Sequence, residues 1–122
     1  MLVVASQLEY EERATAEINE LDNAFAAMKR SGAFDMALLL DRVQCLEGSG
    51  HGYNYPLITD YAGSLHHFLG NCDHLDEAGI DVVETHLTAL AVVASNRMSG
   101  QGNETTRELG KCLRSLVGRS LE

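Results

Sequence analysis

The chain has 122 residues, a formal charge of −9 at pH 7 and 45% hydrophobic residues, with one proline and no tryptophan. This length suits a single domain over residues 1–122, and the composition favours packed helices over a β-sandwich, so we expect an all-α fold. The negative charge and the scattered Lys and Arg residues argue against nucleic-acid binding, and no run approaches the roughly 20 apolar residues that span a membrane, so we expect a cytoplasmic protein.

A first helix is predicted from Ser6 to about Arg30, because apolar residues recur there at helical spacing. Gly32 then ends this helix in the manner of a C-terminal glycine. A second helix is expected to begin near Phe34 or Asp35. The apolar stripe of the first helix consists of Ile18, Leu21, Phe25 and Met28.

The second helix is predicted to be amphipathic, with one stripe in the core and an adjacent face outside it. The buried stripe consists of Leu39, Val43 and Leu46. The residues of the adjacent face are Leu40, Asp41, Gln44, Glu47 and Gly48.

Three more helices are predicted after the second. Pro56 suits the first position of a helix, where its missing N–H has no intrahelical acceptor. Gly70 to Gly79 is expected to be a polar connection, and a deeply buried fourth helix should follow it. Thr105 and Glu108 have capping-box spacing at the start of the last helix. The apolar positions of the fourth helix are Ile80, Val83, Leu87, Leu90 and Ala94, and those of the fifth are Leu109, either Cys112 or Leu113, Leu116 and Val117.

Five helical segments joined by short turns predict an up-and-down four-helix bundle with an additional N-terminal helix. The end of the second helix reads Gln44-Cys45-Leu46-Glu47-Gly48, and after a glycine-rich turn the chain continues with Tyr55-Pro56-Leu57-Ile58-Thr59. These two segments resemble the histidine phosphotransfer (HPt) family of bacterial phosphorelays, whose motif is His-x-Leu-Lys-Gly. The resemblance extends from about Asp35 to Val93, and it implies the same bundle shape.

The resemblance also implies where the functional residues would lie. In the family, the histidine accepts a phosphoryl group from a receiver aspartate, the lysine balances its charge, and the glycine leaves room for the partner. Here Gln44 replaces the histidine, and an amide nitrogen is not nucleophilic. Glu47 replaces the lysine and reverses the charge. The sequence therefore suggests a non-catalytic adaptor that binds a receiver domain or a histidine kinase through Leu40, Asp41, Gln44, Glu47 and Gly48.

Two alternatives remain open at this stage. A displaced histidine could accept the phosphoryl group, with His67 the first candidate and His51 the second, although neither is followed by Leu-Lys-Gly. The chain could instead be a helical module that forms homo-oligomers and has no connection to phosphorelays.

No cofactor is expected. A metal ion is not expected either, although His66, His67, Cys72 and His74 lie within nine residues, because adjacent histidines on a helix point about 100° apart. The three cysteines are far apart and odd in number, so we interpret them as reduced thiols. His86 flanks the core stripe of the fourth helix and is interpreted as a partly buried histidine with its hydrogen bonds satisfied.

Overall fold

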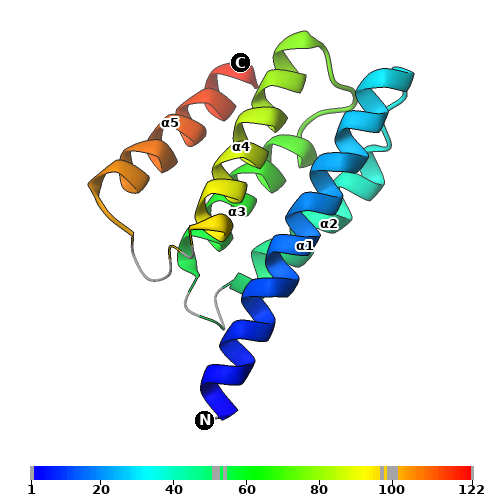
Figure 1. The fold of residues 1–122 in the computed structure, drawn as a ribbon. Helices are drawn as coiled ribbons and strands as arrows, with labels where there is room; N and C mark the ends of the chain where they lie inside the picture. The colour runs from blue at the N-terminus through cyan, green and yellow to red at the C-terminus, as the bar shows by residue number, and fades with distance from the viewer. Residues whose placement is uncertain (1, 51–52, 54, 97, 99–101, 122) are drawn as a thin grey trace.

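The computed structural model describes residues 2–50, 53, 55–96, 98 and 102–121, with side chains from residue 8 onward. This part of the chain contains five α-helices and no strand, which confirms the all-α fold. The helices are α1 (Leu2–Ser31), α2 (Met36–Gly50), α3 (Pro56–Gly70), α4 (Glu77–Ser95) and α5 (Glu104–Ser120). Figure 1 shows them as neighbouring rods of the bundle.

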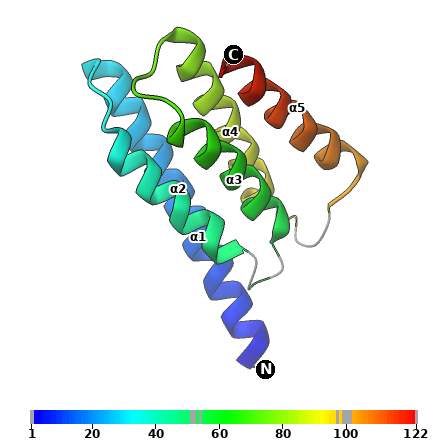
Figure 2. The same cartoon turned by 180° about the vertical axis from the view of Figure 1, so that it is seen from behind.

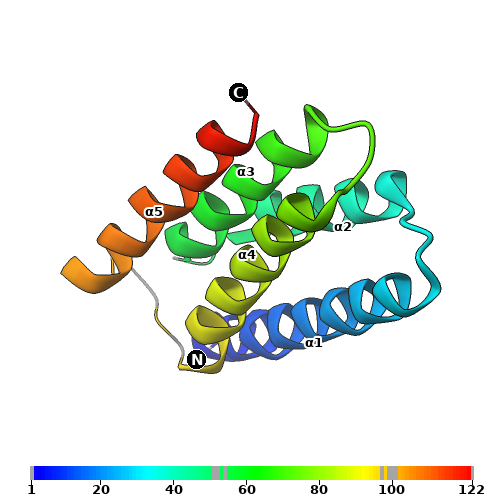
Figure 3. The same cartoon turned by 90° about the horizontal axis from the view of Figure 1, so that it is seen from above.

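The expected bundle with one extra helix is present, and the helix contacts show which helix is the extra one. α1 packs on α2 and α4, α2 packs on α3, and α3 packs on α4, so these four helices close a ring. α5 packs on α3 and α4 outside that ring, as the view from above shows (Figure 3). The additional helix is therefore the C-terminal one by its packing, whereas the sequence analysis placed it at the N-terminus. α1 instead belongs to the ring, and its N-terminal end projects past the other helices (Figure 2).

The core lies inside this ring and under α5, and it is built from the predicted apolar stripes. α3 and α4 contribute most of its members, with α4 burying residues on a broad part of its surface as expected. On α5, Leu113 is buried and Cys112 is exposed, which decides between the two residues that the periodicity allowed. Fully buried aliphatic residues near the centre include Leu39, Leu46, Ile58, Leu65 and Leu90.

The ends of the first helices follow from local chemistry. Gly32 has φ +77°, a left-handed conformation that glycine adopts without strain, and its N–H donates to Met28 O at 2.8 Å. Asp35 then precedes α2, and its side chain accepts a hydrogen bond from Leu38 N at 3.0 Å. Pro56 is the first residue of α3, as predicted.

The connection between α3 and α4 is shorter than predicted. Asp76 is the N-cap of α4, and its side chain accepts a hydrogen bond from Gly79 N at 2.7 Å. Glu77, Ala78 and Gly79 therefore belong to the first turn of the helix. The sequence analysis placed them in the connection because it took Gly79 as the end of the loop, whereas Gly79 N is the donor to the N-cap.

The cap of α5 corrects a second prediction. The capping box is formed by Asn103 and Thr106, and not by Thr105 and Glu108. Asn103 Oδ1 accepts from Thr106 N at 2.9 Å, and Thr106 Oγ1 accepts from Asn103 N at 2.8 Å. Gly102 precedes the box with φ +74°, and a Cβ there would lie 2.2 Å from Thr106 Oγ1. Both pairs have the same spacing, but only Asn103 directly follows the glycine that turns the chain into the helix.

Replacing the cap provides a direct check of this correction. We expect Asn103→Ala to lower the free energy of unfolding by about 0.5–2 kcal/mol, because Thr106 N loses its acceptor. Thr105→Ala is the matched control, since Thr105 is exposed, and its effect should stay within about 0.5 kcal/mol. Urea unfolding followed by circular dichroism measures both variants. Equal losses in the two variants would contradict the assignment of the cap.

Among the described helices, α4 alone is long and apolar enough to cross a membrane, with a mean hydropathy of 1.3 over its most apolar 18 residues. Half of those residues are buried inside the bundle. The apolar character of α4 is therefore accounted for by its place between α1, α3 and α5.

Candidate functional site

The predicted partner-binding residues lie together on the outer side of α2, which we call the α2 face: Leu40, Asp41, Gln44, Glu47 and Gly48. Asp41, Gln44 and Gly48 are exposed, and Leu40 and Glu47 are half-buried. A Cβ added at Gly48 would have no neighbouring atom within 4 Å. The internal packing of the protein therefore does not require glycine at this position, although glycine in a helix costs about 1 kcal/mol relative to alanine.

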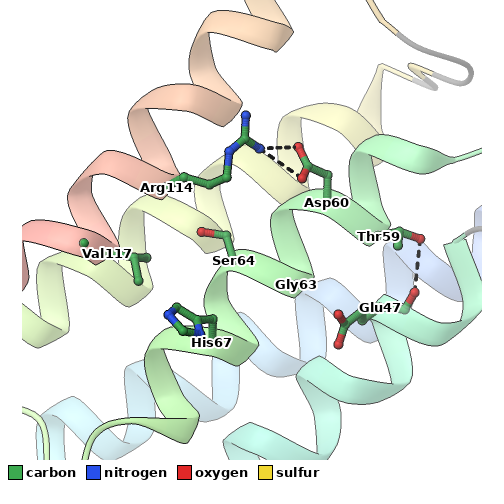
Figure 4. Close-up of a pocket in the computed structure, with 9 residues that line it drawn as sticks. Glu47, Thr59, Asp60, Gly63, Ser64, His67, Arg114 and Val117 are labelled. Atoms are coloured by element: carbon green, nitrogen blue, oxygen red, sulfur yellow. Dashed lines mark hydrogen bonds and ion pairs between the residues drawn. The ribbon is translucent and has the colours of Figure 1, made fainter. Parts of the chain in front are cut away.

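Glu47 lies at the border between α2 and α3, and its side chain turns toward α3. Its backbone carbonyl accepts a hydrogen bond from Thr59 Oγ1 at 3.1 Å (Figure 4). Its Oε2 atom lies over Gly63, where an added Cβ would come within 3.0 Å of it. Gly63 thus leaves the space in which the Glu47 carboxylate lies.

His66 of α3 completes this border site, because its imidazole bridges Glu47 and Gln44. His66 Nδ1 is 2.6 Å from Glu47 Oε1, and His66 Nε2 is 3.2 Å from Gln44 Nε2. The Gln44 amide nitrogen can only donate, so His66 Nε2 accepts and the ring proton sits on Nδ1, from which it is donated to Glu47. We call Gln44, Glu47 and His66 the border triad.

The border triad changes the expected effect of Glu47. A carboxylate in place of the family's lysine was expected to repel phosphoryl groups, but Glu47 is paired with His66 across the helix interface. The imidazole is half-exposed, and its Nε2 lone pair is held on the side that faces Gln44. An imidazole oriented by a carboxylate is a chemically competent nucleophile or base.

The other predicted histidines do not join the border triad. His67 is exposed and lines a groove over α3 that Glu47 also borders (Figure 4). His51 lies outside the described residues. Within the described ranges, no group of three or more His, Cys, Asp and Glu side chains is arranged to hold a metal ion.

Sequence reasoning missed His66 as a member of the site, because it considered His66 only as a metal ligand. The contact with Glu47 depends on how α2 and α3 are aligned, and spacing within one helix does not determine that alignment. One local signal was available: Gly63 and His66 are three residues apart and therefore lie on the same side of α3. A small residue beside a polar one on a helix face indicates a close approach by a neighbouring helix.

A groove of about 530 Å³ lies over α3 between α2 and α5. At one end Arg114 Nη1 binds both carboxylate oxygens of Asp60, at 2.8 and 3.0 Å. The lining residues are Glu47, Thr59, Asp60, Gly63, Ser64, His67, Arg114, Val117 and Gly118. Figure 4 shows these side chains converging from three helices.

Ser64 links this groove to a buried histidine of α4. His86 is 0% exposed, and its Nδ1 is 2.7 Å from Val82 O while its Nε2 is 2.8 Å from Ser64 Oγ. A carbonyl oxygen can only accept, so Nδ1 carries the proton and Nε2 accepts from the Ser64 hydroxyl. His86 is thus more deeply buried than the partly buried residue that the sequence analysis expected.

Burial lowers the pKa of His86 below its ordinary value of 6.5, and the hydrogen bond with Val82 only partly opposes this effect. The unfolded chain therefore binds a proton at this residue at a higher pH than the folded chain does. The contribution of neutral His86 to the free energy of unfolding is fully present above about pH 6.5. It is lost as the pH falls from 6.5 toward the lower pKa that His86 has in the folded chain.

This linkage has a measurable consequence. We expect the free energy of unfolding to fall below pH 6.5 by up to about 1.4 kcal/mol per pH unit from His86. Two-dimensional NMR of the imidazole C–H resonances should show that His86 has a pKa below 6.5, the ordinary value for histidine. A titration of His86 at or above 6.5 would contradict its assignment as a desolvated, neutral residue.

Comparison of the chain with protein-family models, with curated proteins and with solved structures finds no match, so its function is inferred from the geometry of these sites.

Proposed function

We propose that the protein is an HPt-like adaptor that binds a receiver domain or a histidine kinase through the α2 face without carrying a phosphoryl group. The observation that carries the proposal is Gly48, an exposed helical glycine with open space around it and no packing reason within the described chain. Such a glycine weakens the helix, and a partner that approaches the backbone closely is a physical reason for its presence.

The chemistry of Gln44 supports a binding role. Gln44 is exposed at the position where the resembling family has its acceptor histidine, and its amide cannot form a stable phosphoramidate as an imidazole can. The Glu47 carboxylate is also turned toward α3, where its Oε1 atom lies 2.6 Å from His66 Nδ1. The α2 face therefore offers the Gln44 side chain and the Gly48 backbone as its uncharged polar contacts.

The test is a bulky, uncharged substitution at Gly48. We expect Gly48→Leu to weaken binding to receiver domains of the same cell at least tenfold, while leaving the fold intact, because leucine is a better helix former than glycine. Isothermal titration calorimetry measures the affinity, and urea unfolding measures the stability.

Gly118→Leu is the matched control, because Gly118 is also an exposed helical glycine with no atom within 4 Å of its Cβ position. It should bind receivers as the unaltered chain does. Equal binding by the Gly48 and Gly118 variants, or no binding of any receiver or kinase by the unaltered chain, would overturn the proposal.

A second candidate function is favoured by one observation, the 2.6 Å contact between His66 Nδ1 and Glu47 Oε1. In this candidate the displaced acceptor is His66. Its Nε2 lone pair attacks the phosphorus of a receiver aspartyl phosphate, the P–O bond to the aspartate breaks, and the aspartate leaves as a carboxylate. The Nδ1 proton stays on the ring and remains hydrogen-bonded to Glu47 Oε1 throughout. Gln44 must turn away from Nε2 for this attack.

The two candidates are distinguished by mass spectrometry after incubation with a phosphorylated receiver. A displaced acceptor gives an acid-labile phosphoryl adduct that His66→Ala abolishes and that His67→Ala retains. The adaptor gives a complex without an adduct. An adduct that only His67→Ala abolishes would return the role to the histidine that the sequence first indicated.

A further inference from the structure

A second site lies in the groove between α2, α3 and α5, which Glu47 of the border triad also borders. We propose that Ser64 is a nucleophile activated by His86, and that the groove accepts a small uncharged carboxylic ester. This inference is independent of the proposed docking at the α2 face, since neither Ser64 nor His86 belongs to that face.

The hydrogen bonds around His86 give the arrangement that an activated hydroxyl needs. Nδ1–H donates to Val82 O, which fixes the ring orientation and leaves the Nε2 lone pair for the Ser64 hydroxyl at 2.8 Å. His86 is 0% exposed, so water does not compete for this lone pair. Because burial lowers its pKa, His86 is neutral at pH 7, and its Nε2 lone pair is therefore not blocked by a proton.

The accessibility of Ser64 separates this arrangement from a purely structural hydrogen bond. A hydroxyl that served only to satisfy a buried imidazole would need no access from solvent. Ser64 instead is half-buried and lines the groove, while its partner is sealed beneath α3. In Figure 4 Ser64 lies on α3 between Arg114 and His67, and its hydroxyl is directed toward α4, where His86 accepts its hydrogen bond.

The reaction follows from these positions. Ser64 Oγ attacks the carbonyl carbon of the ester, and its proton passes to His86 Nε2. The bond from that carbon to the leaving oxygen then breaks, and the proton on His86 passes to the leaving alkoxide, which departs as an alcohol. The acyl group remains on Ser64 until the alcohol leaves and a water molecule from the groove takes its place. That water attacks the acyl carbon and gives a proton to His86 Nε2. The bond to Ser64 Oγ then breaks, the proton returns to Oγ, and a carboxylic acid is released.

The size and lining of the groove define the substrate class. Its volume of about 530 Å³ lies in the range of small-molecule sites. Val117 supplies apolar surface and Gly118 open surface for the acyl chain. Arg114 is the one Lys or Arg among the described lining residues, and its guanidinium is the cation available to the carbonyl oxygen as that oxygen gains charge.

The first experiment uses the unaltered full chain and a small alkyl fluorophosphonate. In this reaction Ser64 Oγ forms a bond to phosphorus and fluoride leaves, while His86 accepts the serine proton. We expect a single stable adduct by intact mass spectrometry and its location at Ser64 by peptide mapping. No adduct, or an adduct on any other residue, overturns the proposal.

Variants then test the role of His86. Ser64→Ala should abolish the adduct, and His86→Gln should slow its formation by about 10²–10⁴-fold, the usual contribution of a general base. His74→Ala is the matched control, because His74 is exposed and lies outside the groove, and it should react like the unaltered chain. Circular dichroism checks the fold of each variant. If His86→Gln does not fold, the rate of adduct formation in His67→Ala is measured instead. A slower reaction in His67→Ala than in the unaltered chain would overturn the assignment of His86 as the base.

Discussion

Gly50→Ala is expected to lower the free energy of unfolding by about 1–3 kcal/mol, the usual cost of overpacking. An added Cβ would lie 2.7 Å from Thr59 Oγ1, 2.8 Å from Tyr55 O and 3.1 Å from Thr59 N. Two of these atoms belong to the backbone, so a side-chain rotation cannot relieve the clash. The same contact region includes the hydrogen bond from Tyr55 N to Gly50 O at 2.9 Å, which joins the end of α2 to the start of α3.

Gly48→Ala is the control for this effect, since it lies two residues away on α2 and meets no atom within 4 Å. Because alanine is the better helix former, this variant should be up to about 1 kcal/mol more stable than the unaltered chain. Urea unfolding of both variants gives the comparison. A Gly50 variant that is as stable as the Gly48 variant would show that α2 and α3 do not approach as closely as described.

Leu65→Ala should cause the larger loss, about 2–5 kcal/mol, because it removes a side chain from the middle of the bundle and leaves a cavity. Leu65 is 0% exposed and lies on α3, which packs against α2, α4 and α5. The three surrounding helices restrain one another, so they cannot move inward far enough to fill the cavity that the missing side chain leaves. Thermal and urea unfolding both measure the change.

Leu38→Ala is the matched control, because Leu38 is 37% exposed on the outer part of α2. The same atoms are removed there with a smaller loss of buried area and without an enclosed cavity, so the loss should be within about 1 kcal/mol. A loss below 1 kcal/mol for Leu65→Ala would contradict a tightly packed centre.

The apolar stripes of the helices were predictable from the sequence, and the helix starts were predictable only in part. Leu39, Val43 and Leu46 are buried as expected, because their spacing of four and three keeps them on one side of any helix. The predicted cap of α5 was wrong because two pairs of residues have capping-box spacing, and the sequence analysis chose the other pair. The geometry of Gly102, which a residue pattern does not report, selects Asn103.

The candidate sites were less predictable than the core, because they depend on contacts between helices. The exposed positions of Gln44 and Gly48 followed from the periodicity of α2 alone. The pairing of Glu47 with His66, and of Ser64 with His86, requires the relative positions of α2, α3 and α4. No pattern within a single helix determines those positions.

Because α5 lies outside the four-helix ring, we expect it to open locally before the rest of the protein unfolds. α5 buries few residues, among them Leu113 and Val117, and it packs on α3 and α4 only on one side. The amide hydrogens of α5 should therefore exchange with solvent through a local opening in which α1–α4 stay folded. The free energy of this opening should be lower than the free energy of global unfolding. That opening would remove one wall of the groove at Ser64, so a molecule bound there should slow hydrogen exchange in α5 selectively.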